Sequence, residues 1–185
     1  ALKSKFPGQV DSSGKVAIEV HYSSARIDAD VVPCFTYHRY FSSSNYWEGT
    51  KIFRTDGGSI VNYPKQQLNN GRAKNNRTNY AYKKTVRILK RVQYSMVDDG
   101  TFRELPSYFI ECLVYNCPDG TFSHNSWTKI VSQALFHIWD SLKGGEPSES
   151  SSRWVEANEC FYLFHTGQDW TRADGRDFAK AAWNY

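Results

Sequence analysis

The stretch Ala25-Arg-Ile-Asp-Ala-Asp-Val-Val-Pro-Cys-Phe35 alternates between apolar and polar side chains in the manner of a β-strand. Residues two apart on a strand point to the same face, so Asp28 and Asp30 share one face. Two carboxylates about 6–7 Å apart repel each other unless a cation lies between them. Hard oxygen ligands on a rigid strand suit Mg²⁺, whereas the alternative is a half-exposed strand with a solvated acidic face. Pro33 cannot donate to a strand ladder, so pairing should end or bulge there.

The residues before this stretch supply a partner strand. Residues 15–22 carry apolar side chains at every second position, a period that indicates a strand. Ser23 and Ser24 read as a short turn, so the two strands form an antiparallel hairpin with one buried face. A second strand pair around a glycine turn is expected within residues 47–58, and residues 36–70 are otherwise irregular.

The second half of the chain is dominated by helical periodicity. Asn69-Asn70-Gly71 and Asn75-Asn76 are loop signals. A long helix follows over about residues 78–97, with Thr78 or Asn79 as its N-cap. Further helices are expected at residues 107–115 after Pro106, at 125–143, at 154–164, and from Thr171, where Asp174 completes a capping box. The chain is therefore expected to be α+β, with short antiparallel strands preceding a helical bundle.

One segment is strongly basic within a chain whose formal net charge is only +4. Residues 57–97 contain no Asp or Glu and nine cations, namely Lys65, Arg72, Lys74, Arg77, Lys83, Lys84, Arg87, Lys90 and Arg91. A segment of one sign suggests an anionic partner, and a phosphate-bearing ligand is the natural candidate. The alternative is a solvated helix face that acids elsewhere balance in space.

Residues 107–115 are almost wholly apolar apart from Ser107 and Glu111. A helix this apolar is buried, so Glu111 at its centre needs a cation or a hydrogen-bond donor beside it. We expect Glu111 to be a structural ion-pair partner rather than a catalytic group.

Composition narrows the class of protein. The chain has 185 residues and 16% aromatic residues, which fits a globular fold. It has no apolar run of membrane-spanning length, so no membrane partner is expected. The four cysteines lack C-x-x-C spacing and read as reduced thiols of a cytoplasmic protein, with Cys34, Cys112 and Cys160 in apolar surroundings.

Three stretches in this order and spacing resemble the nucleotidyltransferases of the DNA polymerase β superfamily. The branch they resemble contains 2′-5′-oligoadenylate synthetase, cyclic GMP–AMP synthase and the bacterial cGAS/DncV-like enzymes. The stretches are Ile27-Asp-Ala-Asp-Val-Val-Pro-Cys-Phe35, Val86-Arg-Ile-Leu-Lys90 and Pro106-Ser-Tyr-Phe-Ile-Glu-Cys-Leu113. The resemblance extends over most of the chain. It implies that residues 1–70 are the remainder of a nucleotidyltransferase β-core and that residues 71–185 are a helical nucleotide-binding region, together forming one compact unit.

The resemblance implies roles for five residues. Asp30 corresponds to the third metal-binding carboxylate, which also helps to deprotonate the attacking hydroxyl. Arg87 and Lys90 correspond to contacts with the donor triphosphate. Ser107 corresponds to a phosphate contact and Tyr108 to a ring that stacks on the base. Physical chemistry agrees, because cations three apart on a helix can grip one polyphosphate, a helix N-terminus favours phosphate, and an aromatic ring stacks on any base.

The implied reaction is attack of a ribose hydroxyl on the α-phosphate of an NTP, with release of pyrophosphate. It would use Mg²⁺, or Mn²⁺ in its place, and make a cyclic or linear oligonucleotide second messenger of the antiphage type. The family's Gly-Ser turn and first Asp-x-Asp pair do not precede Asp28, so the chain resembles the C-terminal part of such an enzyme. We therefore expect the chain alone to be inactive and the missing N-terminal segment to be its partner.

Two other functions fit the same residues. One is a non-catalytic module that binds nucleotides or RNA through the basic helix and Tyr108. The other is a different polymerase-β-like transferase that acts on tRNA or a small molecule. Nucleic acid is thus a partner that the leading interpretation allows without requiring it.

Overall fold

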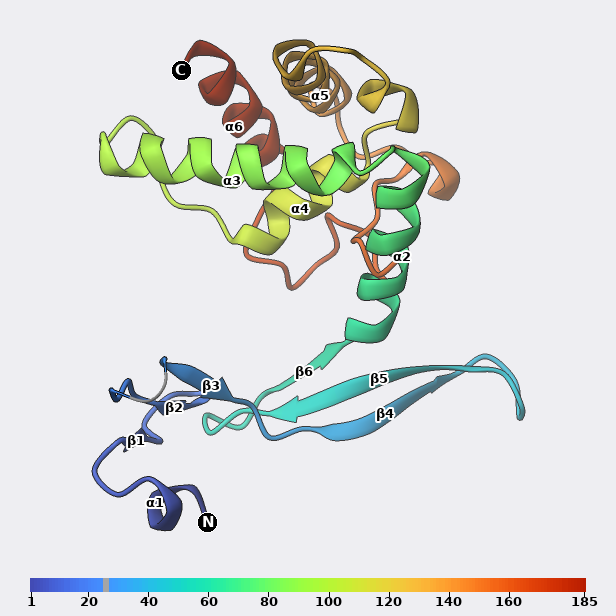
Figure 1. Ribbon diagram of the computed structural model, residues 1–185. Helices are drawn as coiled ribbons and strands as arrows, with labels where there is room; N and C mark the ends of the chain where they lie inside the picture. The colour runs from blue at the N-terminus through green and yellow to red at the C-terminus, as the bar shows by residue number, and fades with distance from the viewer. Residues whose placement is uncertain (25–26) are drawn as a thin grey trace. The chain divides into compact units, whose positions relative to one another are not determined.

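Figure 1 shows the computed structural model, which describes residues 1–24 and 27–185. The chain divides into two compact units, Ala1–Pro64 and Lys65–Tyr185, which we call the N-terminal unit and the helical unit. Short strands dominate the first and long helices the second, so the expected α+β class is confirmed. No helix among the described residues is both long and apolar enough to cross a membrane.

The N-terminal unit begins with a four-residue helix and contains two three-stranded antiparallel sheets. The bounds are α1 (Leu2–Lys5), β1 (Val10–Asp11), β2 (Ile18–Val20), β3 (Ala29–Val31), β4 (Phe35–Tyr40), β5 (Tyr46–Phe53) and β6 (Ser59–Asn62). The first sheet has the order β1-β2-β3 and the second the order β4-β5-β6.

Both expected strand pairs are confirmed. Strands β2 and β3 form the first hairpin, which ends before Pro33, although Ala25 and Arg26 of the expected strand lie outside the described residues. The Oδ1 atom of Asp28 accepts the Tyr22 backbone N–H at 2.6 Å, which ties the two sides of the turn together. Strands β5 and β6 flank the glycine turn. Strand β4 was not expected, because aromatic and polar residues mix along it without a clear period.

The helical unit is built around a buried helix. Its elements are α2 (Pro64–Arg77), α3 (Ala81–Asp98), α4 (Ser107–Tyr115), α5 (Trp127–Ser141) and α6 (Arg172–Asn184), with 3₁₀ turns at Asp119–Phe122 and Ser150–Ser152. Five residues of α4 are wholly buried, namely Phe109, Ile110, Cys112, Leu113 and Val114. Apolar side chains of α3, α5 and α6 pack with them in one core, with Leu89, Ile138 and Phe178 at its centre.

Helix α2 corrects the two loop signals at residues 69–71 and 75–76, which are helical. Its asparagines find partners outside the helix: Asn70 Nδ2 donates to the Ala157 carbonyl at 3.1 Å, and Asn75 Oδ1 accepts the Lys83 backbone N–H at 3.1 Å. Tertiary contacts of this kind outweigh the weak helix propensity of Asn. The local signals at these positions therefore predicted the wrong structure.

Helix α3 begins two to three residues later than expected. Asn79 and Tyr80 take left-handed φ angles of 48° and 63° in the turn between α2 and α3, and Tyr80, instead of Thr78 or Asn79, is the N-cap residue, without a side-chain capping bond. Thr78 still contributes at this end, because its Oγ1 accepts the Tyr82 backbone N–H at 3.2 Å. Helix α4 and the Ser126 boundary of α5 lie where the sequence predicted them.

Two further expectations near the C-terminus have opposite outcomes. Residues 154–164 are not helical, because Val155 and Tyr162 form an isolated antiparallel bridge and Glu159 between them has a φ of 57°. The capping box at α6 is confirmed, with Thr171 and Asp174 bonded in both directions.

All four cysteines are free thiols, but Cys34 is exposed where an apolar environment was expected.

Two buried glycines test the packing of the core. A Cβ added to Gly175 of α6 would lie 2.7 Å from Leu142 Cδ1 and 2.9 Å from Leu113 Cδ2, whereas one added to Gly71 of α2 would meet nothing within 4 Å. We expect Gly175→Ala to lower the free energy of unfolding by about 1–3 kcal/mol through overpacking. Gly71→Ala should raise it by up to about 1 kcal/mol through helix propensity. Urea unfolding measures both, and equal effects would contradict this packing.

Candidate functional site

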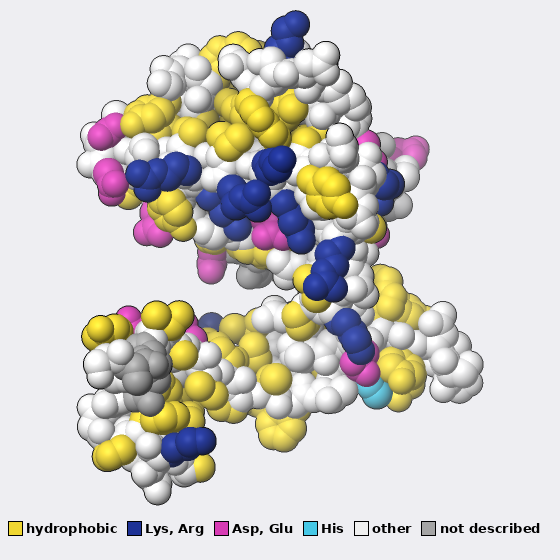
Figure 2. All heavy atoms as spheres, in the orientation of Figure 1, with side chains coloured by type: hydrophobic (Ala, Val, Ile, Leu, Met, Phe, Trp, Pro, Cys, Tyr) yellow, Lys and Arg dark blue, Asp and Glu magenta, His cyan; other side chains and the backbone are white. Residues whose placement is uncertain are grey.

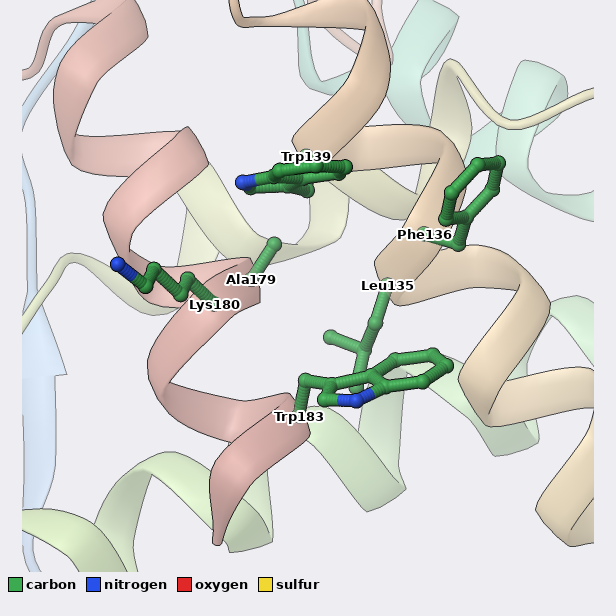
Figure 3. Close-up of a pocket in the computed structure, with 6 residues that line it drawn as sticks. All are labelled: Leu135, Phe136, Trp139, Ala179, Lys180 and Trp183. Carbon is green, nitrogen blue, oxygen red and sulfur yellow. The ribbon is translucent and has the colours of Figure 1, made fainter.

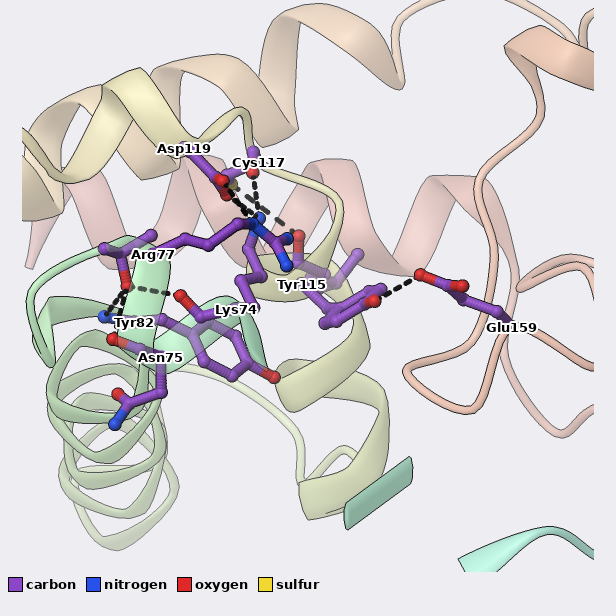
Figure 4. Close-up of polar contacts among 10 residues, drawn as sticks. Lys74, Asn75, Arg77, Tyr82, Tyr115, Cys117, Asp119 and Glu159 are labelled. Carbon is purple, nitrogen blue, oxygen red and sulfur yellow. Dashed lines mark hydrogen bonds and ion pairs between the residues drawn. The ribbon is translucent and has the colours of Figure 1, made fainter. Parts of the chain in front are cut away.

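Lys74 of α2 is a buried cation with a structural role (Figure 4). Its Nζ donates to the Cys117 carbonyl at 2.8 Å and to Asp119 Oδ1 at 2.9 Å. It also lies 5.5–6.0 Å from the centroids of three rings, those of Tyr82, Tyr115 and Phe122. Arg77 Nε donates to the other oxygen of Asp119 at 2.8 Å. The positive charges of Lys74 and Arg77 are therefore balanced by Asp119, an acid from outside the basic segment, as the alternative interpretation expected. The two ion pairs connect α2 to the segment after α4.

Helices α3 and α4 meet through Lys90, Tyr94, Ser107 and Glu111, which we call the α3–α4 corner. Lys90 Nζ lies 3.6 Å from Glu111 Oε2, and the Tyr94 hydroxyl lies 3.3 Å from Ser107 Oγ. Gln67 Nε2 donates to Glu111 Oε1 at 3.3 Å. The expected ion-pair role of Glu111 is therefore confirmed, and one turn of α3 is fixed against one turn of α4.

The N-terminus of α4 is open at this corner. Pro106 precedes the helix, and no side chain caps it. Within residues 1–24 and 27–185, no acceptor is bonded to the backbone N–H of Ser107 or Tyr108. Unpaired N–H groups at the positive end of a helix dipole favour anions, and Lys90 adds a full positive charge close by.

Tyr108 presents a half-buried ring whose hydroxyl is fixed. The hydroxyl donates to Glu156 Oε2 at 3.1 Å and accepts from Asn158 Nδ2 at 3.1 Å. The Trp170 ring packs edge-on against the Tyr108 ring, with centroids 6.4 Å apart. Burial, with Cys112 and Glu156 nearby, raises the pKa of Tyr108 far above its ordinary value. The phenol therefore stays protonated and serves as a hydrogen-bond donor.

Arg87, one turn before Lys90, lies beside a hollow on the surface of α3. It lines a shallow hollow together with Lys84, Ile88, Arg91, Val92 and Trp127. Lys84 Nζ lies 5.5 Å from the centre of the Trp127 ring, and Figure 2 shows the Lys and Arg side chains that gather along this helix. The structure thus places Lys90 beside Glu111 and Ser107 beside Tyr94, with Tyr108 next to Ser107 at the start of α4. Arg87 lines the neighbouring hollow.

Asp30 lies exposed on β3 in the N-terminal unit. Its partner across the strand pair is Glu19 of β2, and Glu19 is in turn opposite Asp11 of β1. Residues in register on antiparallel strands share a face, so three carboxylates form a row across the sheet. His21 lies beside Asp11 and Glu19, with ligand atoms within 4.8 Å of one another. Sequence reasoning missed Glu19 and Asp11, because it did not establish the register.

A separate apolar hollow of about 330 Å³ lies between α5 and α6. Figure 3 shows its lining residues, which are Leu135, Phe136, Trp139, Ala179, Lys180 and Trp183. Lys180 is the one charged group among them, and no residue expected at the site lies here. A polyphosphate would find little in this hollow to pair with.

Comparison of the sequence with known proteins finds one family and several relatives. The family described as the cGAS/DncV-like nucleotidyltransferase C-terminal helical domain matches residues 69–185. A cyclic dipyrimidine nucleotide synthase CdnE from Cecembia lonarensis is 35% identical over 189 residues, which cover 100% of this chain and 63% of the relative. A cyclic dipurine nucleotide synthase from Elizabethkingia meningoseptica is 36% identical over 188 residues, with 62% of its length covered.

Solved structures give the same result. The CdnE cyclic dinucleotide synthase of Elizabethkingia meningoseptica, described with GTP and Apcpp, superposes with a TM-score of 0.89 at 36% identity, covering 100% of this chain and 66% of that one. The c-UMP-AMP synthase CdnE of Rhodothermus marinus, described with Apcpp and Upnpp, gives 0.84 at 27% identity, with 99% and 61% covered. The chain therefore spans less than two thirds of the length of these relatives.

The Asp119 carboxylate predicts a pH dependence of stability. Desolvation raises its pKa, but hydrogen bonds from Arg77 and Lys74 outweigh this and leave the pKa below its ordinary value. A lowered folded pKa means that the stabilisation is fully present above the unfolded pKa and is lost as the pH falls through the folded value. We expect Asp119→Asn to cost about 1 kcal/mol at pH 7, a figure discounted for solvent screening.

Urea unfolding of the native chain and Asp119→Asn between pH 7 and pH 3 measures this difference, which should shrink below about pH 4. The control is Asp140→Asn, because Asp140 pairs with Lys143 at the surface, 2.8 Å away. Its effect should stay below about 0.5 kcal/mol. A cost for Asp119→Asn that is undiminished at pH 3 would contradict the ion-pair assignment.

Proposed function

Because the chain belongs to the cGAS/DncV-like nucleotidyltransferase family, we propose that its parent protein is a nucleotidyltransferase that makes a cyclic or linear oligonucleotide. It would transfer NMP from an NTP to a ribose hydroxyl and release pyrophosphate. Relatives matched over the whole chain are named as cyclic nucleotide synthases, and two similar structures are described with NTPs or their analogues. We also propose that the product is a second messenger of the antiphage type. The proposed location is the cytoplasm, because cytoplasmic reductants keep cysteines such as these as free thiols.

The observation that carries this proposal is the α3–α4 corner. At 3.6 Å the contact between Lys90 and Glu111 is an electrostatic pair beyond hydrogen-bond range, so the N–H donors of Lys90 can still reach a phosphate. The Ser107 hydroxyl and the open N–H groups of α4 would bind the same triphosphate. The base would stack on Tyr108, and Arg87 would extend the positive surface by one turn of α3.

Asp30 is the residue we propose as the metal-binding and proton-accepting carboxylate. The residues present fit a divalent cation, because Asp30 and Glu19 offer hard oxygen ligands opposite each other on a rigid strand pair. A bound Mg²⁺ or Mn²⁺ would supply charge stabilisation of the transferring phosphate. An Asp30 carboxylate oxygen would take the proton of the attacking hydroxyl. The N-terminal segment that longer relatives possess would complete the site, and we propose that this chain alone is inactive.

The role of Lys90 is tested by nucleotide binding to this chain. We expect Lys90→Ala to weaken ATP or GTP binding about tenfold, since it removes a charge-assisted contact with phosphate. Lys180→Ala, at the apolar hollow, is the matched control and should leave affinity unchanged. Isothermal calorimetry measures both, and circular dichroism confirms that the variants fold. Equal affinities for the native chain and Lys90→Ala would refute the proposal that the nucleotide binds at the α3–α4 corner.

The role of Asp30 is tested in the intact protein, meaning this chain together with the segment that its longer relatives carry. Asp30→Asn should abolish oligonucleotide formation, because the amide can neither accept the proton nor bind the cation well. Asp28→Asn is the matched control, since the amide oxygen can still accept the Tyr22 N–H. Chromatography of the products from labelled NTPs measures both. Native turnover by Asp30→Asn would refute the assignment.

A further inference from the structure

Glu156 is a buried carboxylate that the proposed reaction does not use directly. It is only 4% exposed, and both of its oxygens are engaged. Oε2 accepts from the Tyr108 hydroxyl at 3.1 Å and from Asn158 Nδ2 at 2.7 Å. Oε1 accepts from Gln168 Nε2, and His165 Nε2 lies 3.6 Å away. A carboxylate this deep is stable only because its lone pairs are satisfied by such donors.

These contacts over-determine the position of the Tyr108 hydroxyl. Asn158 Nδ2 donates to that hydroxyl at 3.1 Å as well as to Glu156, so the three side chains close a triangle. Asn158 is itself fixed, because its Oδ1 accepts the Cys160 backbone N–H at 2.7 Å. The phenol thus has one acceptor and one donor at set positions, and a change of the χ1 angle that swings the side chain away would break both contacts.

The far side of the carboxylate contacts Gln168 and His165. His165 Nδ1 lies 2.8 Å from the Thr166 carbonyl, which assigns the ring proton to Nδ1. Its Nε2 can then accept from Gln168 Nε2 at 2.9 Å, while the same amide also donates to Glu156. Glu156 therefore connects α4 with the segment that precedes α6.

We propose that Glu156 is a positioning residue, whose carboxylate holds the Tyr108 side chain at the place from which its ring stacks on the base of the bound NTP. The inference rests on the proposed function, because it assigns a cause to the stacking role of Tyr108. A ring held in place before the ligand arrives loses less conformational entropy on binding than a mobile ring. The effect of Glu156 on nucleotide binding is transmitted through the Tyr108 hydroxyl.

Substitution of Glu156 by Gln separates this role from packing. Glu156→Gln keeps the size of the side chain but turns one acceptor oxygen into an amide donor, facing groups that are donors themselves. Tyr108→Phe removes the same hydrogen bond from the other side and keeps the ring. If Glu156 acts through Tyr108, the two changes share one effect and their combination adds little.

The chain offers a matched control on the same helix. The Tyr115 hydroxyl donates to Glu159 Oε1, so a second phenol–carboxylate bond lies seven residues further along α4 from Tyr108. Neither residue belongs to the α3–α4 corner. Glu159→Gln and Tyr115→Phe remove a bond of the same chemistry without touching the ring that is proposed to stack.

Steady-state kinetics of the intact protein with ATP and GTP tests the proposal. We expect Glu156→Gln and Tyr108→Phe each to raise KM about tenfold, with kcat changed less than about twofold. The double variant should resemble either single variant. Glu159→Gln and Tyr115→Phe should leave KM unchanged, whatever they do to the melting temperature.

Several results would overturn the proposal. Unchanged KM in Glu156→Gln, or increases that multiply in the double variant, would show that Glu156 does not act through Tyr108. If Glu156→Gln does not fold, Tyr108→Phe decides alone: a raised KM supports the proposal and an unchanged KM refutes it. A native protein that neither binds nor turns over NTPs would refute the proposed function and this inference with it. Native turnover with unaffected variants would refute the inference alone.

Discussion

Burial of helix α4 is the constraint on which the helical unit depends. Its central residues are wholly buried, so the polar side chains among and beside them need partners from other segments. Tyr108 finds Glu156, Glu111 finds Lys90 and Gln67, and Tyr115 finds Glu159. Each of these contacts draws a different part of the chain against the same helix. The contacts of Tyr108 and Glu111 therefore serve both the core and the candidate site.

The position of the α3–α4 corner follows from that burial. Helix α4 is enclosed along its length but begins at an exposed Ser107, where its unpaired N–H groups are accessible. Lys90 and Tyr94 lie one turn apart on α3. Lys90 contacts Glu111, and Tyr94 contacts Ser107. Helices that are locked by core packing hold functional groups more rigidly than loops do. One helix, α4, thus contributes its buried residues to the apolar core and its exposed N-terminus to the surface that favours anions.

Much of this arrangement could be read from the sequence, and the exceptions have physical causes. The apolar run after Pro106 and the period of residues 82–96 predicted α4 and α3, because packing agrees with local pattern there. Burial of the central Glu111 predicted a partner, but naming Lys90 required the fold. Helix α2 was missed because tertiary contacts override its asparagines, and the network around Glu156 was missed because residues 154–164 were read as a helix. Glu19 was missed because strand register depends on the whole hairpin.

The account makes one central claim, that an NTP binds at the α3–α4 corner with its base on Tyr108. A crystal structure of the intact protein with Mg²⁺ and a non-hydrolysable NTP tests it most directly. The account predicts the triphosphate against Lys90 and Ser107, with the base stacked on the Tyr108 ring. A triphosphate seated instead in the hollow beside Trp127, with the Tyr108 ring free of contact, would contradict it.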